Sequence, residues 1–185
     1  MTHARRVAGI ALIVLAAALA SSASAHEFVA SKTGEAKVRS TTAQVFEVDA
    51  TTVECAKASA SFEVTATKSE TLAVHKLEYK ECKGLGETLD VSAGSYVFEA
   101  VDLLSFAKAL TISSESGCSI VLEAGANKNR EAVHYTNSAG KLRAKQELRS
   151  LSYSGSGGMC GVGGNEGRLS GTLEFELEGG TLEWR

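Results

Sequence analysis

The chain has 185 residues and a formal net charge of −3 at pH 7, with lysine and arginine interspersed among slightly more aspartate and glutamate. This balance argues against a nucleic-acid partner, because contacts to phosphates need a basic surface. The chain contains 18 glycines and no proline, so its turns must depend on glycine, asparagine, aspartate and serine.

The N-terminal segment has the three parts of an export signal. Arg5 and Arg6 give a positive start, the run 7–20 is apolar, and Ala23-Ser24-Ala25 forms an A-x-A cleavage motif. The apolar run is shorter than the ~20 residues of a membrane span. We therefore expect residues 1–25 to be a secretory signal peptide, exported by the general secretory route rather than the twin-arginine route.

Residues 26–185 then form the mature protein, which has the size of one ordinary domain. It is more acidic than the whole chain, because export removes two arginines and no carboxylate. We expect a single domain that is secreted and extracytoplasmic, without a transmembrane segment.

Four cysteines lie in the mature chain, at Cys55, Cys82, Cys118 and Cys160. An even number in an exported chain favours two disulfides, for which three pairings exist. We predict Cys55–Cys82 and Cys118–Cys160, because each pair brackets one stretch of alternating strands. The spacing contains no close cysteine pair of the zinc-binding type. We therefore predict no metal and no cofactor.

Alternation of apolar and polar residues predicts antiparallel strands along most of the mature chain. The clearest early examples are 44–48, 62–67, 71–79 and 95–101. Two segments, 103–110 and 141–151, fit a helix or a strand. We interpret both as extended because strands flank them closely, so at most one short helix is expected.

The C-terminal residues give the strongest local prediction. Leu173, Phe175 and Leu177 alternate with glutamates, Gly179-Gly180 follows, and Leu182 and Trp184 resume the alternation. This pattern predicts a β-hairpin.

Few residues offer catalytic chemistry. The mature chain has three histidines, His26, His75 and His134, and none lies in a catalytic motif. Disulfide pairing leaves no thiol nucleophile. The C-terminal glutamates can share a strand face, and paired carboxylates about 5–9 Å apart can cleave glycosides. These glutamates are Glu174, Glu176 and Glu178, with Glu183 expected on the partner strand. A solvated outer face explains them more simply, and we predict no catalytic residue.

Several short motifs together suggest a resemblance. In chain order they are His26-Glu27-Phe28, Thr52-Val53-Glu54-Cys55, Ser116-Gly117-Cys118, Gly157-Gly158-Met159-Cys160-Gly161 and the ending Glu176-Leu177-Glu178-Gly179-Gly180-Thr181-Leu182-Glu183-Trp184. With these motifs the chain resembles a multi-copy family of small secreted bacterial proteins of unknown function. The resemblance implies paired cysteines and extended segments, but no activity, substrate or catalytic residue.

These observations predict an all-β fold, a single antiparallel sandwich or barrel of roughly nine to eleven strands. The expected function is non-enzymatic: a binding or cell-surface module whose partner is an envelope polysaccharide or a protein. One alternative is a small glycosidase-like hydrolase that uses the C-terminal glutamates. Another is an apolar-ligand carrier, which requires a hollow barrel lined by phenylalanine and leucine.

Overall fold

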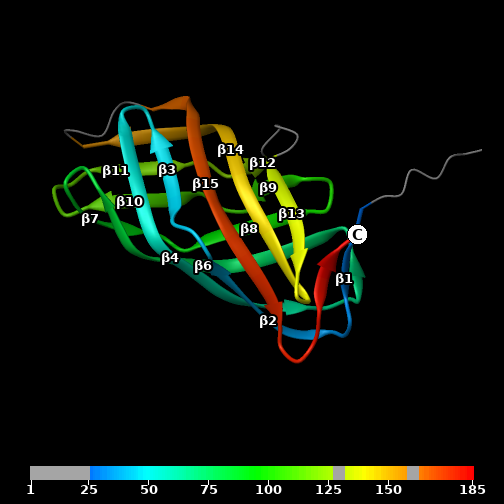
Figure 1. Cartoon of the computed structure of the whole chain (residues 1–185). Helices are drawn as coiled ribbons and strands as arrows, with labels where there is room; N and C mark the ends of the chain where they lie inside the picture. Colours follow the sequence, from blue (N-terminus) through cyan, green and yellow to red (C-terminus); the bar gives the residue numbers. More distant parts are fainter. Residues whose placement is uncertain (1–25, 127–131, 158–162) are drawn as a thin grey trace, which may run out of the picture.

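The computed structural model describes residues 26–126, 132–157 and 163–185, and these residues form strands joined by turns and loops (Figure 1). The strands are β1 (Phe28–Ala30), β2 (Gly34–Ser40), β3 (Gln44–Val48), β4 (Thr51–Val64), β5 (Lys68–Ser69), β6 (Thr71–Gly84), β7 (Glu87–Val91), β8 (Gly94–Glu99), β9 (Leu103–Phe106), β10 (Leu110–Ser114), β11 (Ser119–Leu122), β12 (Gly125–Ala126), β13 (Val133–Ser138), β14 (Lys141–Ser156), β15 (Gly164–Leu177) and β16 (Leu182–Trp184). The all-β prediction is therefore confirmed. Within these ranges no helix has the length and apolar character that a membrane crossing requires.

The large sheet closes on itself at one end of the molecule. β4 pairs with β6, and the order continues through β7, β10, β11, β14 and β15 to β3, which pairs again with β4. All of these pairings are antiparallel. Closure leaves no free sheet edge in this ring of strands.

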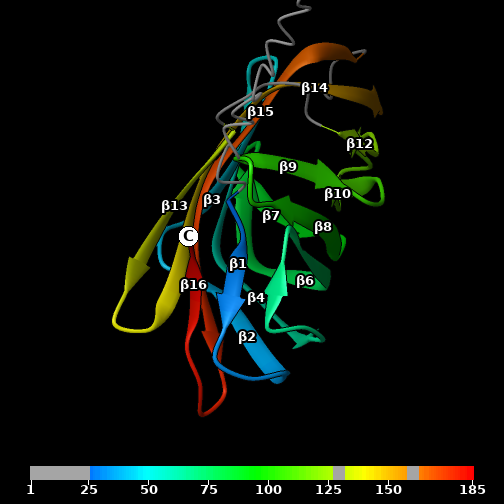
Figure 2. The same ribbon diagram turned by 90° about the vertical axis from the view of Figure 1, so that its right-hand side faces the viewer.

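At the other end the sheet opens into two layers. One layer runs from β4 through β2, β15 and β14 to β13. The other runs from β6 through β8 and β9 to β12. Figure 2 shows β13 on one side of the molecule and β8, β9 and β12 on the other. The closed end is thus barrel-like and the other end is a two-layered sandwich, so this chain contains both architectures that the sequence left open.

The predicted C-terminal hairpin is wrong. The turn forms, with Gly179 at a φ of 61° and a hydrogen bond from the Gly180 N–H to the Leu177 carbonyl. However, β16 pairs with β1 in a separate small sheet that also contains β5 (Figure 2). The reason is that β14 and β2 already occupy the two edges of β15, so the returning strand must find another partner.

The Cys55–Cys82 disulfide is confirmed. The two residues lie directly opposite each other on β4 and β6, with their Cα atoms 3.9 Å apart and both side chains buried. The other predicted bond, Cys118–Cys160, involves Cys160, which lies outside the described residues. Cys118 itself is not a free thiol. The second disulfide thus stays a prediction.

Aromatic side chains fill the space between the two layers. Phe175 of β15 makes edge-to-face contacts with Phe62 of β4, at 5.8 Å between ring centroids, and with Phe98 of β8, at 5.1 Å. Tyr96 of β8 and Tyr79 of β6 join their hydroxyl groups in a buried hydrogen bond. A core filled in this way leaves the hollow-carrier alternative without support.

Neither segment that could have been helical is a helix: 141–151 lies within β14, and 103–110 forms β9, a bend at 107–109 and the first residue of β10. Gln146 breaks the apolar pattern of β14, yet it is buried in line with the apolar residues around it. It lies opposite Gly171 of β15, and buried Gln44 of β3 packs against the same glycine. A Cβ atom on Gly171 would lie 2.3 Å from Gln44 Nε2. Because Gly171 has no side chain, the buried side chain of Gln44 fits beside it.

Candidate functional site

Six charged side chains lie together on the outer surface of one layer. They are Lys37 and Arg39 on β2, Lys141 and Arg143 on β14, and Glu174 and Glu176 on β15. We call this set the charged face. On each strand the intervening residues point into the core, so the period-two alternation of the sequence brings the charges to one surface.

The strand register orders these charges in rows that cross the sheet. Glu174 lies opposite Arg143 on one side and opposite Arg39 on the other. Glu176 lies opposite Lys37 and accepts a hydrogen bond from Lys141 Nζ at 2.8 Å. Each carboxylate is therefore flanked by cations, which is the favourable cross-strand arrangement.

Glu174 is the centre of this network. Its Oε1 accepts hydrogen bonds from Arg39 Nη2 at 2.9 Å and from Lys141 Nζ at 3.3 Å, and its Oε2 accepts one from Arg143 Nε at 2.9 Å. The residue is only 5% exposed although it lies on the outer surface. Three cations are thus held side by side over one buried carboxylate.

These contacts keep both carboxylates ionised. The hydrogen bond from Arg39 is the largest cause that lowers the pKa of Glu174 to about 2, against the opposing effect of burial. The hydrogen bond from Lys141 likewise lowers the pKa of Glu176. A glycosidase needs one carboxylic acid whose pKa is raised, so that it can protonate the leaving group. Glu174 and Glu176 have the opposite property.

The four C-terminal glutamates do not form the expected cluster. Glu183 lies on β16, where it pairs with Val29 of β1 and binds Arg185 at 2.7 Å. Glu178 lies in the turn after β15, where its backbone N–H bonds to Glu35. Only Glu174 and Glu176 stand side by side, so the expected partnership with Glu183 is wrong.

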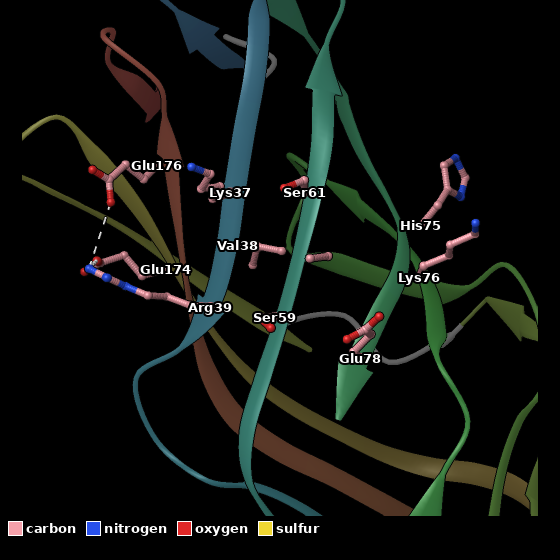
Figure 3. Close-up of a pocket in the computed structure, with 11 residues that line it drawn as sticks. Lys37, Val38, Arg39, Ser59, Ser61, His75, Lys76, Glu78, Glu174 and Glu176 are labelled. Carbon is pink, nitrogen blue, oxygen red and sulfur yellow. Dashed lines mark hydrogen bonds and ion pairs between the residues drawn. The ribbon is translucent and has the colours of Figure 1, made fainter. Parts of the chain in front are cut away.

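A groove of about 620 Å³ borders the charged face (Figure 3). Lys37, Arg39, Glu174 and Glu176 line one side. The opposite side is lined by His75, Lys76 and Glu78 of β6, with Ser59 and Ser61 of β4 between the two sides. The groove is polar and open, which suits an extended polar ligand better than a small apolar molecule.

The three histidines lie far apart in the strand order. His75 is exposed on β6, His134 is exposed on β13 opposite Lys145, and His26 stacks on Trp184 with ring centroids 4.4 Å apart. Within the described ranges, no group of three or more His, Cys, Asp or Glu side chains is placed to hold a metal ion.

Glu174 makes stability depend on pH in the acidic range. Its pKa is lower in the folded protein than its ordinary value of 4.5, so its contribution is complete above about pH 5 and is lost as the pH falls toward 2. We expect Glu174→Gln to lower the free energy of unfolding at pH 7 by about 1–2 kcal/mol, since solvent screens the exposed cations. Urea unfolding at several pH values measures this.

The same titration contains its own control. Wild type and Glu174→Gln should converge below about pH 2, where the carboxylate is protonated. A constant difference between the two proteins from pH 7 to pH 2 would contradict the assigned ion network.

The sequence indicated the carboxylates of this site but not its cations. Lys37 with Arg39 and Lys141 with Arg143 are each two positions apart on a strand, so alternation alone places each pair on one face. It does not reveal that β2 and β14 both pair with β15.

No family model, curated protein or solved structure matches this chain.

Proposed function

We propose that the protein is a secreted, non-enzymatic β-domain that binds an acidic polysaccharide of the cell envelope through the charged face. The observation that carries this proposal is the buried carboxylate of Glu174, which fixes Arg39, Lys141 and Arg143 side by side. Cations that are held in place before binding lose less side-chain entropy when a ligand arrives.

The local charge supports an anionic ligand. The charged face contains four cations and two carboxylates, whereas the chain as a whole has a formal net charge of −3. This contrast concentrates positive potential on one surface, which attracts and orients polyanions. The open groove beside it can take a chain molecule lying across β2 and β4.

Two further features fit this function. The buried Cys55–Cys82 disulfide is compatible with an extracytoplasmic location, where disulfides form and persist. The lowered pKa values of Glu174 and Glu176 leave neither carboxylate of the charged face suited to donate a proton for hydrolysis. Binding without cleavage is therefore the simpler interpretation.

Calorimetric titration with alginate, a carboxylated polysaccharide, tests this proposal, with neutral dextran as the control ligand. We expect alginate binding that weakens as salt is added, because screening reduces each ion contact. The double variant Lys37→Gln/Arg39→Gln should bind about 5- to 10-fold more weakly at low salt. Glu176→Gln should bind more tightly, since it removes a negative charge from the same surface.

A control is Lys68→Gln, an exposed lysine of β5 that lies opposite Val29 of β1 and forms an ion pair with Glu27. It removes one positive charge, half of what the double variant removes, at a site away from the charged face, and should leave alginate affinity unchanged. Absence of alginate binding, or equal losses in all three variants, would rule out the proposed surface.

A further inference from the structure

The hairpin of β4 and β6 splits along its length. The two strands pair from Glu54↔Lys83 as far as Ser59↔Glu78 and have no further partners in register beyond that point. Lys76, at a φ of 56°, lies at an irregularity of β6 between Val74 and Leu77. Such a bulge bends a strand away from its neighbour. From here β4 joins one layer and β6 the other.

The backbone of β4 is unpaired on the side that faces the split. The Glu35 carbonyl of β2 accepts a hydrogen bond from the Glu178 N–H, just after β15. The backbone N–H and C=O groups of odd-numbered β2 residues therefore point toward β15, and those of even-numbered residues point toward β4. Ala36 is paired with Phe62, so the even-numbered residues of β4 bond to β2. Ser61 and Glu63 therefore direct their N–H and C=O groups toward the split.

The backbone of β6 has the same property on the opposite side. The Glu70 carbonyl, just before β6, accepts a hydrogen bond from the Ala100 N–H, just after β8. The even-numbered residues of β6 from Leu72 to Val74 therefore bond to β8. Ala73 therefore directs its N–H and C=O groups away from β8, toward β4, and His75, at the start of the irregular stretch, directs its N–H the same way.

At the start of β6, the split ends where the backbone of Thr71 bonds to a nearby side chain. The Ser69 Oγ accepts a hydrogen bond from the Thr71 N–H and donates one to the Thr71 carbonyl. Thr71 thus has its backbone groups satisfied without a neighbouring strand. The length without a β4–β6 partner is therefore residues 60–64 on β4 and residues 72–77 on β6.

The split is a groove in the molecular surface. A pocket of about 350 Å³ is lined by Ser61, Glu63, Ala73 and His75, which lie beyond the last paired position of β4 and β6, and by Phe62 and Leu72. It shares Ser61 and His75 with the groove beside the charged face. Two strand edges that have no strand partner at these positions therefore face each other across the groove.

We propose that this groove binds an extended peptide segment of a partner protein, which adds as a strand between β4 and β6. Successive backbone groups on one edge of a strand repeat every two residues, about 6.8 Å. A peptide in extended conformation has the same repeat on both of its edges, so it can bond to Ser61 and Glu63 on one side and to Ala73 and His75 on the other. Recognition of this kind is strand addition.

The residues that line the groove also determine which peptide side chains fit it. Every second residue would point inward between Phe62 and Leu72, so these positions take small apolar side chains such as alanine or valine. The other positions would point outward among Ser61, Glu63 and His75, and take polar side chains. A polysaccharide fits this channel less well, because no tyrosine or tryptophan, the rings that most often stack on sugars, is among its lining residues.

The first experiment uses amide hydrogen exchange on the protein with and without a capped heptapeptide of alternating valine and threonine between terminal lysines. In the free protein the amides of Ser61, Glu63, Ala73 and His75 should exchange fast, whereas those of Phe62 and Leu72 should be protected. The peptide should protect the first four amides. Strong protection of these four in the free protein would overturn the proposal.

A matched peptide and a matched pair of variants isolate the backbone contribution. The same peptide with N-methyl groups on its valines keeps its side chains but loses hydrogen-bond donors, and should bind at least about 10-fold more weakly. Ala73→Pro removes one donor of the groove and should weaken binding about 5-fold, while Ala73→Val keeps it and should not.

The outcomes separate this site from the charged face. Lys37→Gln/Arg39→Gln should leave peptide affinity unchanged, and Ala73→Pro should leave alginate affinity unchanged. If Ala73→Pro fails to fold, the N-methylated peptide still decides the question on the wild-type protein. Equal binding of the plain and N-methylated peptides would exclude strand addition.

Discussion

Phe175→Ala is expected to lower the free energy of unfolding by about 3–5 kcal/mol, the range for removing a large aromatic side chain from a packed core. Phe175 is fully buried and contacts Phe62 from its own layer and Phe98 from the other. Its removal leaves a void between the two layers. Urea unfolding followed by tryptophan fluorescence measures the loss.

Two variants calibrate this result. Phe175→Leu retains part of the volume and should cost about 1–2 kcal/mol. Val101→Ala changes a side chain that is 54% exposed, and should cost less than about 0.5 kcal/mol. If Phe175→Ala cost no more than Val101→Ala, the two-layer core described above would be incorrect.

Removal of the Cys55–Cys82 disulfide should have a comparable effect. The bond closes a loop with a sequence separation of 27 residues, for which loop-closure entropy gives a stabilisation of about 3.5 kcal/mol. The double variant Cys55→Ala/Cys82→Ala should be destabilised by about this amount, because alanine leaves no polar group in the buried space. Thermal and urea unfolding under oxidising conditions provide the measurement.

The control for the disulfide is Lys57→Ala on the same strand. Lys57 is exposed and forms an ion pair with Glu81 across the hairpin. Surface ion pairs contribute about 0–1 kcal/mol, so this change should have little effect. A double cysteine variant as stable as Lys57→Ala would mean that the bond does not constrain the unfolded chain.

Local alternation in the sequence was sufficient to predict most strands. It predicted the inward direction of Leu173, Phe175 and Leu177, and the extended conformation of 103–110 and 141–151 is largely confirmed by β9 and β14. It indicated roughly nine to eleven strands, and the described residues contain sixteen. The difference comes partly from β5 and β12, which have two residues each and are too short for a periodic pattern.

Pairing between distant strands could not be predicted in the same way. Gly179-Gly180 indicated a turn correctly, but a turn does not determine which edge is free to accept the next strand. Glu174 shows the same limit, because its burial depends on cations from β2 and β14. These contacts join residues more than 30 positions apart, and no local pattern encodes them.

The four longest strands have a consequence for folding. β4, β6, β14 and β15 contain 14, 14, 16 and 14 residues, and each runs through both the closed end and the two-layered end. Neither half can melt while the other persists, so a single cooperative transition is expected. Phe46 near the start pairs with Leu169 near the finish, so the ring cannot close until almost the whole polypeptide is available. Folding should therefore be slow and should follow synthesis rather than accompany it.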